Sequence, residues 1–283
     1  MNKLFRIALW VCVVLGCLAL LFNIASFLFV APALVVPSLI LAAFFIAVFL
    51  FLMRLSPMWA RPAAGWVAMS LLWGSGTAVG LALLSSGSVL TLATASGWED
   101  SLMSWAGAYP EEIAKASGVF FVLLAFRQLN RPWHGWVVGA TIGMGFEALE
   151  NMMYGITGGV MHPASDWIGL WQTWGIRLIA GPGLHVFLTG LAGWGIGWAI
   201  FAGYRPLWWR LAMLFGFLFL AFALHFAWNY TFSSEVLLVI KAVLVALVLY
   251  PLSIYLTIRG NRLAKQDSSY SYSPGTESLR TVV

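Results

Sequence analysis

Carboxylates, imidazoles and amides recur in the apolar parts of this chain at spacings that place them on common helix faces. The pairs four residues apart are Glu111 and Lys115, Phe146 and Glu150, Glu147 and Asn151, Glu150 and Tyr154, and His225 and Asn229. Side chains at i and i+4 are neighbours on a helix surface. Glutamates and histidines that share a site in this way are suited to activating a water molecule, so the set points to hydrolysis.

Two schemes of hydrolysis suit these residue types. In the first, a zinc ion with one open position is held by protein ligands, and Glu111 or Glu112 is the general base. Its ligands would be Glu150, His185 and His225. In the second, no metal is bound, and a glutamate in a poorly solvated pocket takes the proton from water. His225 and Asn229 would then donate hydrogen bonds to a developing oxyanion. The residues leave the choice of scheme and of base open.

Helices that cross a membrane must position these polar groups. The chain has 283 residues, of which 61% are hydrophobic and 9% charged, and its mean hydropathy is +0.90. We predict an all-α polytopic protein with about eight spans of about 20 residues each. A single transmembrane domain is expected over residues 1–265, and a disordered tail over 266–283. Nucleic acid is not an expected partner, because the basic residues are spread singly along the loops.

The expected spans follow the apolar runs between basic and Pro-containing links. The first span ends near residue 30, and the other seven cover about 35–53, 65–86, 110–127, 134–156, 177–201, 208–231 and 236–258. Two long connections, residues 86–109 and 157–176, are expected to be loops with aromatic anchors, the first with a short surface helix. Pro110 is expected at the first helical turn, where the helix dipole would favour Glu111 and Glu112. Arg177 is expected to be an anchor at a span boundary.

The distribution of basic residues predicts the orientation of the spans. If both termini are cytoplasmic, the cytoplasmic segments hold twelve of the fifteen lysines and arginines, as the positive-inside rule requires. The polar residues of four spans then fall within about 15 Å of the outer surface. The sequence therefore predicts one site in the outer leaflet, built by Glu111, Glu150, His185 and His225.

The order of these motifs is similar to that of a known family. The motifs are Glu111-Glu112-x-x-Lys115, Phe146-x-x-x-Glu150-Asn151-x-x-Tyr154, His185, and His225-x-x-x-Asn229. On four successive spans between about 105 and 230, they resemble the PrsW family of intramembrane proteases, which is related to the CAAX prenyl endopeptidases. The prenyl endopeptidases carry histidine where this chain has Glu150.

The resemblance implies a polytopic protease in a bacterial cell membrane. It would cut a membrane-anchored protein, such as an anti-sigma factor, near the extracytoplasmic face. By this resemblance Glu111 and Glu112 are the paired glutamates, Glu150 is the glutamate of the second motif, and His185 and His225 are the essential histidines. The family is often described as metalloproteases, which fits a zinc ion without requiring one.

We therefore predict hydrolysis of a peptide bond in which Glu111, with Glu112 beside it, activates the water, and Glu150 and His185 orient that water or bind a metal ion. His225 and Asn229 would polarise the carbonyl, and Lys115 would hold one glutamate. The supporting residues would be Phe146, Glu147, Asn151 and Tyr154. Two other functional classes stay open. A transporter of protons or divalent metal ions also uses Glu and His on facing helices, although the inner halves of these spans are nearly apolar. An inactive relative that binds and shields a membrane partner is the third class.

Overall fold

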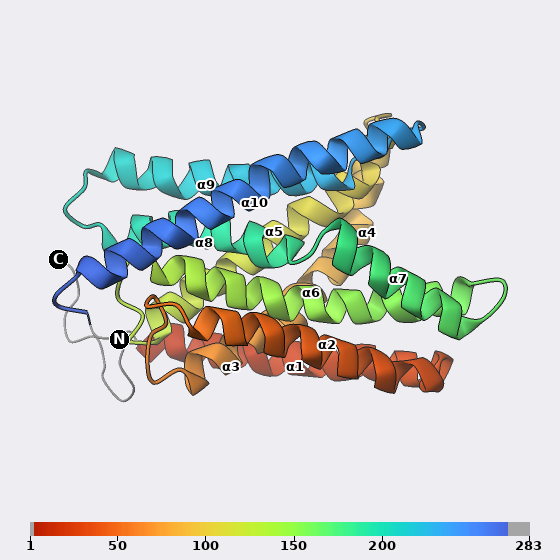
Figure 1. Ribbon diagram of the computed structural model, residues 1–283, viewed down its shortest axis with the longest axis horizontal. Coiled ribbons are helices and arrows are strands. Elements are labelled where there is room, and N and C mark those ends of the chain that lie inside the picture. Colours follow the sequence, from red (N-terminus) through yellow and green to blue (C-terminus); the bar gives the residue numbers. More distant parts are fainter. Residues whose placement is uncertain (1–2, 271–283) are drawn as a thin grey trace.

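The computed structural model describes residues 3–270, which form helices and contain no strand (Figure 1). The elements in chain order are α1 (Lys3–Val30), α2 (Pro32–Arg54), α3 (Ala64–Leu72), the π-helix η1 (Trp73–Ala78), α4 (Val79–Thr94), the 3-10 helix η2 (Glu99–Ser101), α5 (Leu102–Ala125), α6 (His134–Met161), α7 (Asp166–Ala180), α8 (Leu184–Phe201), α9 (Leu207–Asn229) and α10 (Glu235–Gln266). The prediction of an all-α polytopic protein is confirmed.

Within the described residues, six helical segments are long and apolar enough to cross a membrane. Outer helices such as α1 leave large apolar side chains uncovered by protein, for example Phe22 and Phe29, which are 77% and 91% exposed. Such surfaces are compatible with lipid. Helix α1 begins and α10 ends at the same end of the bundle (Figure 1). The cytoplasmic location of that end stays a prediction.

Helix α6 runs through the middle of the bundle, with α1 to α3 along one side and α9 and α10 along the other (Figure 1). Its close neighbour is α8, and glycines four residues apart make the approach possible. A Cβ atom on Gly143 would lie 2.0 Å from the backbone oxygen of His185, and one on Gly139 would lie 2.2 Å from that of Thr189. Only glycine fits there, so these contacts fix His185 against α6.

The two segments expected to be loops are largely helical. Helix α4 continues to Thr94, α6 continues to Met161, and α7 occupies most of the second segment. Hydroxyls in α4 donate to backbone oxygens of the preceding turn, as Ser86 does to Ala82 at 2.6 Å and Thr91 to Gly87 at 3.0 Å. Since these bonds satisfy the hydroxyls locally, the polar residues do not end the helix.

Pro110 lies inside α5, and the prediction that it begins a helix is wrong. The helix starts at Leu102 and η2 precedes it, so Glu111 and Glu112 are in its middle. Proline cannot donate to the backbone oxygen of Ala106, and in membrane helices the surrounding groups tolerate that loss. The two glutamates are therefore stabilised by side-chain partners. The N-terminus of α5 is too far from them for the helix dipole to contribute.

The expected sixth span is divided into two helices. Residues 181–183, Gly-Pro-Gly, separate α7 from α8, and Gly183 has a φ of +72°. Glycine adopts this left-handed conformation without the cost that a side chain would bring. The break lets α7 leave the direction of α8 (Figure 1) and brings Arg177 beside α6.

The residues that follow α10 pack against the link between α5 and α6. Arg131 donates from Nε to Oδ2 of Asp267 at 2.7 Å and from Nη2 to Oγ of Ser269 at 2.8 Å. Tyr270 is buried against Trp133 and His134. The start of the expected tail therefore contacts the bundle, while residues 271–283 lie outside the described part of the chain.

Candidate active site

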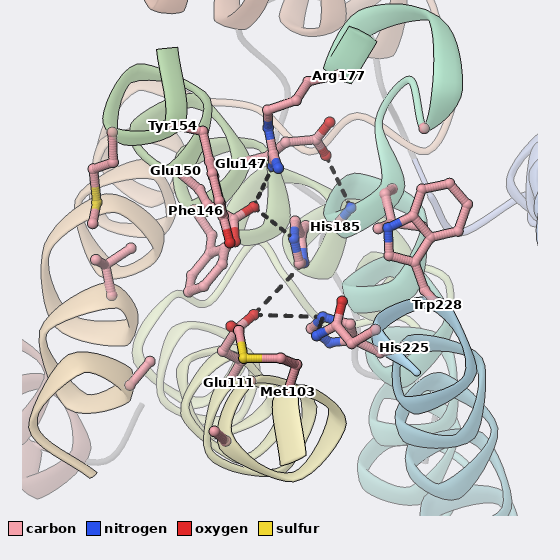
Figure 2. Close-up of a pocket in the computed structure, with 18 of the residues that line it drawn as sticks. Met103, Glu111, Phe146, Glu147, Glu150, Tyr154, Arg177, His185, His225 and Trp228 are labelled. Carbon is pink, nitrogen blue, oxygen red and sulfur yellow. Dashed lines mark hydrogen bonds and ion pairs between the residues drawn. The ribbon is translucent and has the colours of Figure 1, made fainter. Parts of the chain in front are cut away.

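A cavity of about 650 Å³ lies among α4 to α9 (Figure 2). Its ionisable lining residues are Glu111, Glu147, Glu150, Tyr154, Arg177, His185 and His225. Its apolar lining comes from α4 to α9, and includes Val79, Leu83, Met153, Ile176 and Trp228. The cavity thus combines a polar centre with apolar walls.

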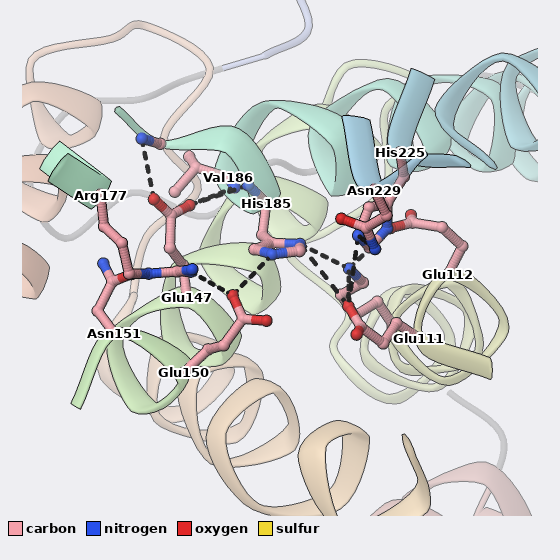
Figure 3. Close-up of polar contacts among 12 residues, drawn as sticks. Glu111, Glu112, Glu147, Glu150, Asn151, Arg177, His185, Val186, His225 and Asn229 are labelled. Atoms are coloured by element: carbon pink, nitrogen blue, oxygen red, sulfur yellow. Dashed lines mark hydrogen bonds and ion pairs between the residues drawn. The ribbon is translucent and has the colours of Figure 1, made fainter. Parts of the chain in front are cut away.

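Glu111 faces two histidines from two other helices across this centre (Figure 3). Its Oε2 atom lies 3.7 Å from Nε2 of His225 and 4.0 Å from Nδ1 of His185. The two imidazole rings are 4.9 Å apart between centroids. The side chain of Glu111 is 12% exposed, and those of the histidines are 3% and 2% exposed. One carboxylate and two imidazoles from α5, α8 and α9 therefore meet at one point.

The second nitrogen of each histidine is held by a different carboxylate. Nδ1 of His225 lies 2.8 Å from Oε1 of Glu112, and Nε2 of His185 lies 2.9 Å from Oε2 of Glu150. Because each of these nitrogens donates its hydrogen to a carboxylate, the other nitrogen of each ring keeps its lone pair. Both lone pairs are on the side of Glu111.

Glu147 fixes the position of the helix that carries His185. Its carboxylate accepts hydrogen bonds from the backbone N–H groups of Gly183, His185 and Val186, at 3.0, 2.9 and 3.3 Å. These donors belong to the start of α8, where N–H groups have no partner within the helix and where the dipole favours a negative charge. Glu147 is thus a positioning residue that caps α8 from α6.

Glu150 is oriented by Arg177. Nη2 of Arg177 lies 2.5 Å from Oε2 of Glu150, and Nε of the same guanidinium donates to Oδ1 of Asn151. The guanidinium also lies over the ring of Tyr154, 4.4 Å from its centroid. The sequence predicts Arg177 as an anchor at a span boundary and does not predict this contact. An arginine at membrane depth needs an acidic partner, and the glutamates of the preceding span are the feature of the sequence that indicates one.

The chain matches the model of a known protein family. Residues 62–256, more than half of the chain, match the model of a family described as PrsW family intramembrane metalloprotease. The chain belongs to the PrsW family. No curated protein and no solved structure matches the chain. The matched range contains every site residue named above, and family membership makes the protein an intramembrane peptidase and decides against a transporter.

The donor set of this PrsW protein fits a metal ion. Glu111, His185 and His225 each offer one ligand atom, and these atoms lie within 4.8 Å of one another. Histidines that bind metals usually donate their other N–H to a carboxylate, as both do here. The sequence assigns Glu150 as the third ligand, but in the structure Glu111 stands beside the imidazoles. Glu150 contacts only one of the two imidazoles, His185, whose Nε2 atom shares the Oε2 of Glu150 with Arg177.

The remaining residues that the sequence predicts for this PrsW site lie around the same centre. Asn229 places Nδ2 3.2 Å from Nε2 of His225 and lines the cavity. Phe146 packs its ring against His185, with 4.9 Å between ring centroids. Lys115 is fully buried and lies beside Glu111 and Glu112. Glu112 contacts His225 behind the site and does not line the cavity.

Proposed function

We propose that this PrsW peptidase cleaves a membrane-anchored protein by means of a water molecule activated in the cavity described above. The observation that carries the proposal is the position of Glu111 between two imidazoles, 3.7 and 4.0 Å from His225 and His185. Glu112 and Glu150 each contact the second nitrogen of one ring, so the orientation of both rings is fixed before a substrate arrives. Such pre-organisation lowers the barrier of a hydrolytic step.

In this proposal Glu111, His185 and His225 hold a zinc ion. Bound there, zinc would supply a Lewis acid that lowers the pKa of a water molecule and polarises the scissile carbonyl. The residues around it have other tasks. Glu112 orients His225, Glu150 orients His185, and Glu147 holds the backbone from which His185 projects.

Glu150 is the proposed general base. It lines the cavity and is 16% exposed, whereas Glu112 is 5% exposed and lies behind the imidazole. The Oε2 atom of Glu150 is held by Arg177 and His185, whereas its Oε1 atom has no hydrogen-bond partner among the described residues and can accept a proton from water. Asn229, on the opposite side, is placed to donate from Nδ2 to the carbonyl oxygen as negative charge develops there.

The proposed substrate is a protein with a transmembrane anchor, in a bacterial cell membrane, of the kind to which anti-sigma factors belong. The apolar walls from α4 and α7 suit a peptide segment that arrives from lipid. The proposed side of cleavage is the extracytoplasmic face, because the distribution of basic residues favours cytoplasmic ends of the chain under the positive-inside rule.

The test is turnover of a membrane-anchored model substrate by the full chain in liposomes. Glu111→Gln, His185→Ala and His225→Ala should each lower kcat by at least about 10²-fold, because each removes a group at the reacting centre. Glu99→Gln and His162→Ala, which change the same residue types outside the cavity, should retain turnover. Wild-type turnover in both Glu111→Gln and His225→Ala would overturn the site assignment.

Metal dependence is tested on the same preparation. A chelator should abolish turnover, and Zn²⁺ should restore it in the wild type but not in Glu111→Gln. Full turnover after the metal has been removed to below one ion per hundred chains, verified by elemental analysis, would refute the role of zinc and favour the metal-free scheme.

A further inference from the structure

Lys115 is a buried cation at the centre of the site, and the proposed hydrolysis gives it no step. Its side chain is 0% exposed. Its Nζ atom lies 2.7 Å from Oε1 of Glu112, 2.9 Å from Nδ1 of His185 and 3.5 Å from Oε2 of Glu111. The ammonium also lies 4.4 Å from the centroid of the Phe146 ring, where an aromatic face stabilises a cation.

Two of these contacts involve atoms that the proposed metal site needs. The lone pair on Nδ1 of His185 accepts a hydrogen bond from the ammonium, and an imidazole nitrogen cannot accept a proton donor and bind a metal ion with the same lone pair. The Oε2 atom of Glu111 is likewise within reach of the ammonium. A positive charge at this distance also repels a divalent cation in a poorly solvated site.

We propose that Lys115 is a tethered competitor of the metal ion, so that it sets how tightly the site binds zinc. This inference rests on the ligand set of the proposed function. Without metal, the ammonium bridges Glu111, Glu112 and His185 and supplies the positive charge that the carboxylates need. With metal bound, it retains Glu112 and the Phe146 ring, neither of which belongs to the ligand set.

The competition has a physical consequence for the chain without metal. Four glutamates line or back the site, and Glu147 among them accepts backbone N–H groups. Among the described residues, Arg177 forms an ion pair with Glu150, and Lys115 is the cation that offsets part of the charge on Glu111 and Glu112. The bundle can therefore fold before it meets a metal ion, at the cost of a weaker site.

The experiment measures Zn²⁺ affinity of the metal-stripped full chain in nanodiscs, by competition with a chromophoric chelator. Lys115→Met removes the ammonium and keeps an unbranched apolar stem, and it should bind Zn²⁺ at least about tenfold more tightly than the wild type. Lys115→Gln, which retains a donor for Glu112, should shift in the same direction and serves if the Met variant does not fold. Lys241→Met is the control, because Lys241 bonds the backbone oxygens of Trp228 and Tyr230 outside the site.

A second readout separates competition from a structural role. The melting temperature of Lys115→Met without metal should fall below that of the wild type, and Zn²⁺ should raise it by more than it raises that of the wild type, because tighter binding stabilises the native state more. A loss of packing alone would leave the rise caused by Zn²⁺ equal in the two proteins. Unchanged or weaker Zn²⁺ affinity in both Lys115 variants overturns the proposal.

Combining Lys115→Met with Glu111→Gln distinguishes this failure from failure of the ligand set. Zn²⁺ binding that depends on Glu111 but not on Lys115 overturns the competitor role alone. Zn²⁺ binding that does not depend on Glu111, or no binding in any variant, overturns the ligand set and the competitor role together.

Discussion

Nδ1 of His225 lies 2.8 Å from Oε1 of Glu112, and this contact turns Nε2 of the same ring toward Glu111. The neighbouring glutamates of α5 thus have different positions: Glu111 faces the cavity, and Glu112 stands behind the imidazole (Figure 3). A carboxylate behind a histidine fixes its tautomer and raises its basicity as a ligand. The two adjacent glutamates therefore have different functions: Glu111 acts in the cavity, and Glu112 orients His225.

Glu112→Gln should lower Zn²⁺ affinity by about 10- to 100-fold, because an amide can accept the hydrogen bond but brings no negative charge. Turnover at saturating Zn²⁺ should fall less than in Glu111→Gln. Chelator competition and liposome turnover measure the two effects, with Glu99→Gln as the exposed control. Equal losses of turnover in both variants at saturating Zn²⁺ would contradict the division of roles.

Arg177→Lys should lower kcat by about 10- to 100-fold, because an ammonium cannot bond Glu150 and Asn151 at once and Glu150 loses its fixed orientation. Zn²⁺ affinity should change much less, since Glu150 acts on the metal only through His185. Tyr154→Phe keeps an aromatic face for the cation and is the matched control. Wild-type kcat in Arg177→Lys would show that the orientation of Glu150 is unimportant.

Gly143→Ala should lower the free energy of unfolding by about 1–3 kcal/mol, because its Cβ would meet the backbone oxygen of His185 at 2.0 Å and push α8 from α6. Turnover should fall with it. Gly216→Ala in α9 has nothing within 4 Å of the new atom and should raise that free energy by about 0.5–1 kcal/mol. Thermal unfolding in one detergent compares the pair, and similar melting temperatures would contradict the close approach.

The contact between Asp267 and Arg131 should make stability depend on acid pH. Partial burial raises the pKa of Asp267, but hydrogen bonds from Arg131 and Ser269 outweigh it, and the net pKa is below its ordinary value of 3.8. A lowered pKa means that the contribution is complete above pH 3.8 and is lost as the pH falls further. The melting temperature of the wild type should exceed that of Asp267→Asn at pH 7, and the difference should shrink below pH 4. Ser268→Ala, beside it and exposed, is the control, and a difference that does not vary with pH would refute the assignment.

The sequence predicts most helices because apolar runs of membrane length are interrupted by basic and proline-containing links. It predicts the ends of α4 and α7 poorly. The polar residues of α4 satisfy their hydroxyls within their own helix, and local hydrogen bonds of this kind leave little trace in composition. Pro110 misleads for a related reason, because proline is usual at a helix start and is tolerated inside a membrane helix.

The members of the site can also be predicted from their i,i+4 spacing and common depth, and the structure brings Glu111, His185 and His225 together. Their pairing cannot be predicted in this way. Whether an imidazole meets Glu111 or Glu150 depends on the rotation of α5 relative to α8 and α9, and on the break after α7 that brings Arg177 to Glu150. Those relations come from packing between helices distant in the sequence.

The cap that Glu147 places on α8 also limits how the protein can admit a polypeptide. Separating α6 from α8 would break three hydrogen bonds to one carboxylate and the glycine contacts along both helices. These two helices therefore behave as a single rigid wall, and His185 and Glu150 keep their mutual distance while other parts move. Room for an incoming chain has to come from the other elements of the lining, such as α4, which contributes Val79, Ala82 and Leu83 to the cavity.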